Sequence, residues 1–161
     1  MRSLFATLAL LSSAALLAGA PSPADPIRMI RVWPIWRTAD FFQSYYEYHS
    51  GRELIGRWTV MRSQPDERTG LYFLVRIENK KEAERGATFV VRVISPDSPE
   101  TRVYNFPATV KAGSWVYEIG LTGKDWAIGH VHPVAWDVEL QTAEGAVVAK
   151  KASFLWEKPP R

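Results

Sequence analysis

Val134-Ala135-Trp136-Asp137-Val138-Glu139-Leu140-Gln141 is the stretch that decides the fold class of this chain. Large apolar side chains occupy every second residue, and Asp137 and Glu139 stand between them. Successive side chains of a β-strand point to opposite faces, so this period of two predicts a strand with one face in a core and the other in water. We therefore expect Trp136 to fill the core and both carboxylates to lie on a solvated polar face.

Seven further segments have strand patterns, separated by turn signals. Pro96 and Pro99 flank Asp97 in one turn, and Gly145 is placed to take a positive φ in a tight hairpin. With 134–141, the sequence therefore predicts about eight strands. The other predicted strands are 27–36, 57–63, 71–79, 88–95, 101–106, 115–121 and 146–156.

Many short strands, few helical patterns and turns rich in proline and glycine predict an all-β fold, a single antiparallel β-sandwich over residues 27–157. The strand spacing in 71–156 is similar to that of immunoglobulin-like or fibronectin III-like domains. This resemblance of pattern implies an architecture and no function. Segment 38–50 fits both strand and helix spacing, and we favour a strand or an irregular extended arm there.

The N-terminus has the features of an export signal. Arg2 supplies a positive charge, residues 4–17 form an apolar run, and Ala18-Gly19-Ala20 places small residues where a signal peptidase reads them. The run is shorter than the roughly 20 residues that span a bilayer. We predict a cleaved signal peptide over 1–20, a linker over 21–26 and a C-terminal tail over 158–161. The mature chain is expected to be periplasmic or secreted, without a membrane span.

Composition excludes several classes of function. The 161 residues include no cysteine, which excludes thiol catalysis, thiolate metal sites and disulfides. The formal net charge is only +3, and the basic residues are scattered. Nucleic-acid binding instead requires basic residues clustered in one patch. No nucleophile elbow and no phosphate-binding glycine loop is present. We expect no enzymatic activity, no cofactor and no nucleic-acid partner.

The sharpest local motif is His130-Val131-His132. In a strand, these two imidazoles project to one face and can share a metal ion, with Asp125 and His49 as conceivable further ligands. Pro133 follows directly, which also suits two solvated histidines in a loop.

Aromatic residues are numerous, with seven Trp, six Tyr and seven Phe. Tyr45, Tyr46 and Tyr48 are candidates for a surface platform, because exposed aromatic rings stack on sugars or anchor protein partners. A loop after the strand predicted over 115–121 offers further candidates, because sandwiches bind ligands through their loops. These candidates are Lys124, Asp125 and Trp126.

These features together predict an exported, non-enzymatic β-sandwich module for protein interaction or scaffolding in the cell envelope or outside the cell. A carbohydrate-binding module that uses exposed aromatics is the alternative, with a polysaccharide as its ligand. A metal-binding domain built on His130 and His132 is a further alternative.

Overall fold

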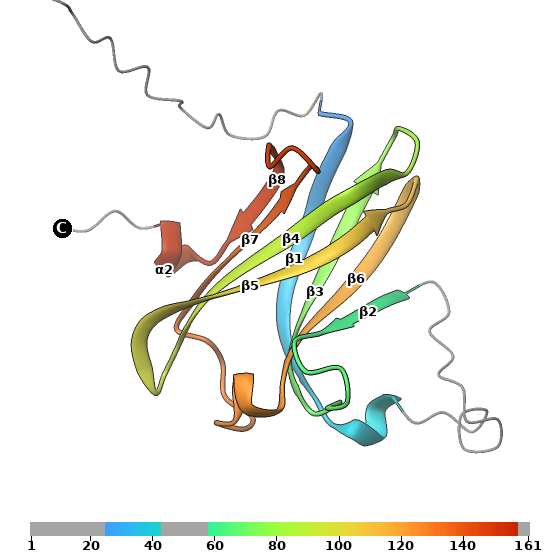
Figure 1. The fold of residues 1–161 in the computed structure, drawn as a ribbon. Coiled ribbons are helices and arrows are strands. Elements are labelled where there is room, and N and C mark those ends of the chain that lie inside the picture. Colours follow the sequence, from blue (N-terminus) through green and yellow to red (C-terminus); the bar gives the residue numbers. More distant parts are fainter. Residues whose placement is uncertain (1–24, 43–57, 158–161) are drawn as a thin grey trace, which may run out of the picture.

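The computed structural model describes residues 25–42 and 58–157, and Figure 1 shows their arrangement. Three short helical elements accompany the strands in this part of the chain: η1 (Ala39–Phe42), η2 (Gly123–Trp126) and α2 (Phe154–Glu157). The strands are β1 (Ile27–Arg37), β2 (Trp58–Arg62), β3 (Gly70–Asn79), β4 (Glu84–Ser95), β5 (Ser98–Val110), β6 (Gly113–Thr122), β7 (Ala135–Gln141) and β8 (Val147–Ala152).

The strands form two sheets of four strands each, which confirms the prediction of an all-β sandwich. One sheet has the order β1-β3-β6-β2 and the other the order β5-β4-β7-β8 (Figure 1). The expectation of purely antiparallel pairing is wrong for one pair, because β2 runs parallel to β6. Three strands separate β2 from β6 in the sequence, so no hairpin turn imposes an antiparallel direction on this pair.

The core lies between the inner faces of the two sheets. Rings from opposite sheets meet there: the Phe89 centroid lies 5.2 Å from that of Tyr117, and the Phe73 centroid lies 5.8 Å from that of Trp136. Trp136 therefore packs toward the core, as its place in the alternation predicts. The core has no disulfide, and burial of these apolar side chains is the main favourable contribution to folding.

The two lateral sides of the sandwich differ. On one side the edge strands β1 and β8 contact each other. On the other side, which we call the open side, a groove separates the edge strands β2 and β5. The sandwich is thus closed along one side and hollowed along the other.

The turns agree with the sequence signals. Between β7 and β8 the backbone N–H of Thr142 donates to the carbonyl of Ala146 at 2.9 Å, and Gly145 has a φ of +82°. Such a φ is strained for residues with a Cβ atom, which explains the glycine. Between β4 and β5 the turn contains Pro96 and Asp97, but β5 extends well beyond the predicted 101–106 because this edge strand tolerates prolines.

The prediction for the last strand is wrong at its C-terminal end. β8 stops at Ala152, and α2 follows instead of a continued strand. The strand ends at Ser153, whose side chain and backbone both accept hydrogen bonds. The Ser153 Oγ accepts from the N–H of Trp136 at 3.0 Å, and the Ser153 carbonyl accepts from the N–H of Trp156, also at 3.0 Å. A serine that satisfies backbone groups in this way competes with continued strand pairing.

Segment 38–50 falls partly outside the described residues. Its described part contains η1, so the preference for a strand or extended arm is wrong over Ala39–Phe42. The N–H of Phe41 donates to the carbonyl of Thr38 at 3.2 Å, and the N–H of Ala39 donates to the Thr69 hydroxyl at 3.0 Å. The first bond closes a local turn of the kind that the helical spacing indicated, and the second ties this turn to Thr69, just before β3.

The predicted solvent face of β7 is also wrong. Asp137 is only 1% exposed and Glu139 only 8% exposed. Their side chains do point away from the core, but Arg92 on β4 and Lys150 on β8 lie beside them and pair with them. Alternation in one strand gives the direction of a side chain, while its burial depends on the neighbouring strands.

Candidate functional site

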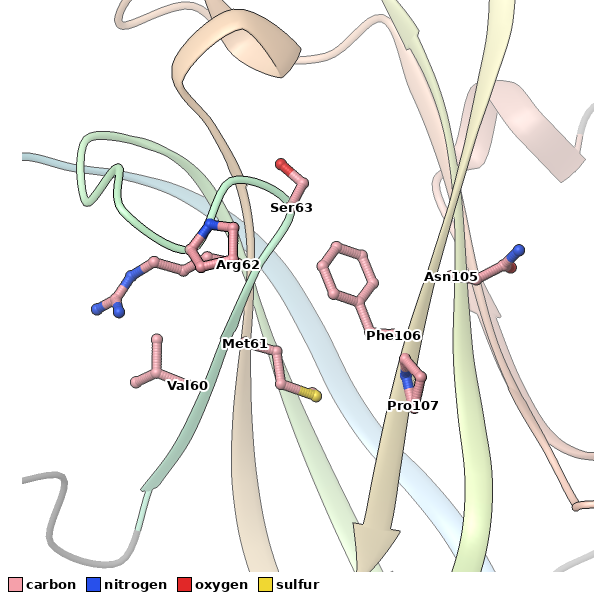
Figure 2. A pocket seen from close by; sticks show the side chains of 8 residues that line it. Val60, Met61, Arg62, Ser63, Asn105, Phe106 and Pro107 are labelled. Atoms are coloured by element: carbon pink, nitrogen blue, oxygen red, sulfur yellow. The ribbon is translucent and has the colours of Figure 1, made fainter.

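A groove lies on the open side of the sandwich (Figure 2). Its volume is about 380 Å³, within the range of sites that take a small ligand or a few side chains. The groove is lined by residues of β2, of the turn after it and of β5: Val60, Met61, Arg62, Ser63, Pro65, Asn105, Phe106 and Pro107.

Met61 and Phe106 form the apolar part of this groove. Met61 is paired with Ile119 of β6, whose side chain is fully buried in the core, and Phe106 is only 5% exposed. Figure 2 shows the two side chains in the space between β2 and β5, whereas the Asn105 side chain points away from that space. The groove therefore ends on the edge of the hydrophobic core.

The backbone of β5 forms the second part of the site. In the described part of the chain, β5 pairs only with β4. Pro107 stands opposite Thr88 in this ladder and has no N–H to donate, so its position is one that faces away from β4. By alternation, the N–H and C=O groups of Thr101, Val103 and Asn105 also point away from β4, toward the open side.

The residues from Thr101 to Asn105 provide little protection against pairing with another strand, whereas Pro99 and Pro107 protect the two ends of this edge. Natural edge strands are commonly guarded by lysines, but β5 contains none. Arg102 is engaged within its own chain, where Nη2 donates to the Ser95 hydroxyl at 2.7 Å and lies 3.0 Å from an Asp97 carboxylate oxygen. Val103, in the middle of the edge, leaves 54% of its surface exposed.

A buried carboxylate lies on the outer face of the other sheet. Glu118 on β6 is fully buried, and neither of its carboxylate oxygens has a hydrogen-bond donor. Arg37 on β1 forms an ion pair with it at 3.6 Å. Burial raises the pKa of Glu118, and the positive charges of Arg37 and Arg62 oppose this rise. The carboxylate thus links two edge strands electrostatically.

Rings of η1 lie over these two arginines. The Arg37 guanidinium lies 3.5 Å from the centroid of the Phe41 ring, and the Arg62 guanidinium lies 4.7 Å from that of Phe42. Arg62 also donates from Nε to the hydroxyl of Tyr72 at 3.0 Å. Because cations bind the faces of aromatic rings, these contacts fix η1 to the sheet, and we interpret the Glu118 cluster as structural.

The second charged cluster is balanced and well paired. Arg92 lies 2.7 Å from Asp137 and 3.0 Å from Glu139, and Lys150 lies 3.3 Å and 3.0 Å from the same two carboxylates. Two positive and two negative charges cancel, and both carboxylates form ion pairs, although Asp137 Oδ1 accepts no hydrogen bond. The cluster joins β4, β7 and β8, and we interpret it as structural.

The two candidate metal ligands, His130 and His132, are both exposed. The His130 ring is stacked near Trp36, with 6.1 Å between centroids. Among residues 25–42 and 58–157, no three His, Asp or Glu side chains are grouped closely enough to hold a metal ion, and Asp125 is not gathered with the histidines. His49 lies outside the described residues, so the metal site stays a prediction.

The candidate binding loop falls in η2 and is only partly at the surface. Lys124 is exposed, and Asp125 accepts a hydrogen bond from the Gln64 side chain at 2.7 Å. Trp126 is only 2% exposed and donates from Nε1 to the carbonyl of Gly129 at 3.2 Å. The prediction that Trp126 belongs to a ligand surface is wrong, because its ring is buried in the core. The candidate tyrosines lie outside the described residues; they are Tyr45, Tyr46 and Tyr48.

The groove was not predicted from the sequence, because Met61 and Phe106 belong to different sheets and only the fold brings their strands together. One signal was present: Pro107 within a strand-like segment indicates an edge strand. No family model matches this chain, and no curated protein matches it either. In the described ranges, no helix has the length and apolar character needed to cross a membrane.

Proposed function

We propose that this chain is an exported, non-enzymatic interaction module that binds a protein partner through the open side between β2 and β5. The observation that supports this most directly is the coincidence of a β5 edge that has no strand partner in the described residues with a groove that contains Met61 and Phe106. The backbone groups of β5 offer hydrogen bonds to an extended segment, and the groove offers a pocket for one of its side chains. This combination is the basis of recognition by strand addition.

The strand order supports an immunoglobulin-like or fibronectin III-like type of sandwich. If β1, β3 and β6 are taken as strands A, B and E, the remaining sheet β5-β4-β7-β8 has the order C′, C, F and G. β2 then occupies the place of strand D, although it runs parallel to its neighbour and precedes strand B in the sequence. In this architecture, edges and loops are the surfaces left for partners.

Export is part of the same proposal and rests on the N-terminal sequence. The charged Arg2, the apolar run over 4–17 and the small residues 18–20 together suit a cleaved signal peptide. A periplasmic or secreted location follows from it. The absence of cysteine gives such a protein a fold that does not depend on the redox state of its compartment.

The test is a crosslinking pull-down from the native cell envelope, with the chain that remains after removal of residues 1–20 as bait. The informative variant is Val103→Lys, which places a charge in the middle of the β5 edge. The matched control is Val147→Lys, because Val147 is a similarly exposed valine, at 46% against 54%, on the opposite edge strand of the same sheet. We expect one protein to be recovered by the wild type and the control and lost with Val103→Lys. Recovery of nothing, or recovery unaffected by Val103→Lys, would overturn the proposal.

A further inference from the structure

We infer that the partner of the β5 edge is a second copy of this chain, with the two β5 strands paired antiparallel about Val103. This inference rests on the proposed function and names its partner. Two properties of the edge lead to it: its free hydrogen-bonding groups complement their own two-fold copy, and its most exposed apolar side chain lies at the centre of that pairing.

The hydrogen-bonding groups match under two-fold symmetry. When Val103 faces Val103 of the second copy, Thr101 stands opposite Asn105 and Asn105 opposite Thr101. Each of these residues directs both its N–H and its C=O away from β4, so every opposed pair exchanges two backbone hydrogen bonds. The next opposed pair that faces away from β4 is Pro99 and Pro107, which have no N–H, so the paired segment ends there on both sides.

The side chains favour the same register. Val103 leaves 54% of its surface exposed in the single copy, and this pairing brings the two valines together on one face of the joined sheet. Thr101 and Asn105 beside them are uncharged. The directly opposed pairs also avoid like charges, because Glu100 falls opposite Phe106 and Arg102 falls opposite Tyr104, which leaves the two Arg102 residues as diagonal neighbours. No like charges are opposed, and such opposition is the usual obstacle to pairing of identical edges.

The pairing would join the two β5-β4-β7-β8 sheets into one continuous sheet. The core residues of each copy remain where they are, because the contact uses the edge backbone and the side chains that flank it. A contact of this size is small beside obligate dimer interfaces, so we expect a dissociation constant in the micromolar range. The dimer is therefore concentration-dependent and is measured by sedimentation equilibrium.

Disulfide trapping tests the register, and the cysteine-free chain makes the test clean. Directly opposed, hydrogen-bonded residues have Cα atoms about 5.5 Å apart, which a disulfide spans. Val103→Cys should therefore form a disulfide-linked dimer on mild oxidation, about tenfold faster than the matched exposed-edge control Val147→Cys. Equal rates for the two variants overturn the inference.

Charge exchange tests the same contact without a covalent link. Val103→Lys and Val103→Glu should each shift sedimentation to the monomer, because each opposes two like charges, and an equimolar mixture should restore the dimer. Val147→Lys should sediment like the wild type. A wild type that stays monomeric up to its solubility limit overturns the inference, as does a mixture that stays monomeric.

These outcomes separate this inference from the proposed function. A tagged bait that recovers an untagged copy of this chain, and loses it on Val103→Lys, supports both. A bait that recovers a different protein through the same edge, with a monomeric wild type, supports the proposed function and overturns the second copy as partner. A bait that recovers nothing overturns both.

Discussion

Substitution of Arg92 by methionine should destabilise the protein more than any other change to the outer face of its sheet. The guanidinium binds two carboxylates at once, at 2.7 Å from Asp137 and 3.0 Å from Glu139. Asp137 is only 1% exposed, so water cannot replace the lost partner. Methionine preserves much of the apolar stem of the side chain, and the measured loss therefore reports mainly on the charge.

The size of the effect follows from the geometry. Removing one partner of a fully buried ion pair costs about 3–5 kcal/mol. Here the Arg92 side chain is 29% exposed, and Lys150 still lies 3.3 Å from Asp137. Both facts reduce the cost, and we expect a loss of about 2–3 kcal/mol in the free energy of unfolding. Lys150→Met should cost less, about 1 kcal/mol, because that side chain is 43% exposed.

The assay is urea unfolding at neutral pH, with the midpoint and the slope fitted together. A pH series adds an independent check. Burial alone raises the pKa of Glu139, but hydrogen bonds from Lys150 and Arg92 outweigh it, so that this pKa lies below its usual value. A carboxylate with a lowered folded pKa stabilises the fold above its unfolded pKa and loses that contribution as the pH falls.

The deficit of Arg92→Met should therefore shrink as the pH falls below about 4, where Glu139 takes up a proton. Two results would refute this reasoning. One is a loss at neutral pH no larger than that of Lys150→Met. The other is a deficit that stays constant from neutral to acidic pH.

Three further predictions concern buried groups. Gly120→Ala should cost about 1–3 kcal/mol in urea unfolding, because a Cβ there would lie 2.5 Å from the Tyr72 ring, which is fully buried; an unchanged midpoint would contradict this. Asn79→Ala should cost about 2–3 kcal/mol in thermal unfolding, since the buried amide donates to two carbonyls and accepts from the N–H of Lys81; a loss below about 0.5 kcal/mol would exclude that role. Burial raises the pKa of Glu118, so the wild type should gain stability relative to Glu118→Gln as the pH falls through that raised pKa, and a pH-independent difference would argue against it.

Much of the fold is predictable from the sequence because alternation reports directly on side-chain direction. The period of two around Trp136 correctly predicted a strand and the face of it that packs on the core. The glycine at 145 correctly predicted the hairpin turn between β7 and β8. Burial of Asp137 was not predictable in this way. It depends on arginine and lysine side chains from neighbouring strands, and one strand's pattern contains no information on which strands adjoin it.

The candidate site was harder to predict than the fold. The groove requires Met61 and Phe106 to meet across two sheets, and pairing of β2 with β6 in parallel follows from no local signal. Trp126 illustrates the opposite error, since its place in a loop after a predicted strand suggested a binding residue, yet the indole fills the core. Loop residues are constrained by the strands that they cap, and a sequence alone does not show those contacts.

The contact between β1 and β8 limits how far the β5-β4-β7-β8 sheet can grow by edge pairing. A sheet with two free edges has a valence of two, and repeated edge pairing of such sheets produces filaments. In the described part of the β5-β4-β7-β8 sheet, the β8 edge lies against β1, and β5 is the edge left for the proposed pairing. A sheet with a valence of one ends its own growth after a single addition, so the proposed joining of two β5 edges would close this sheet to further strands.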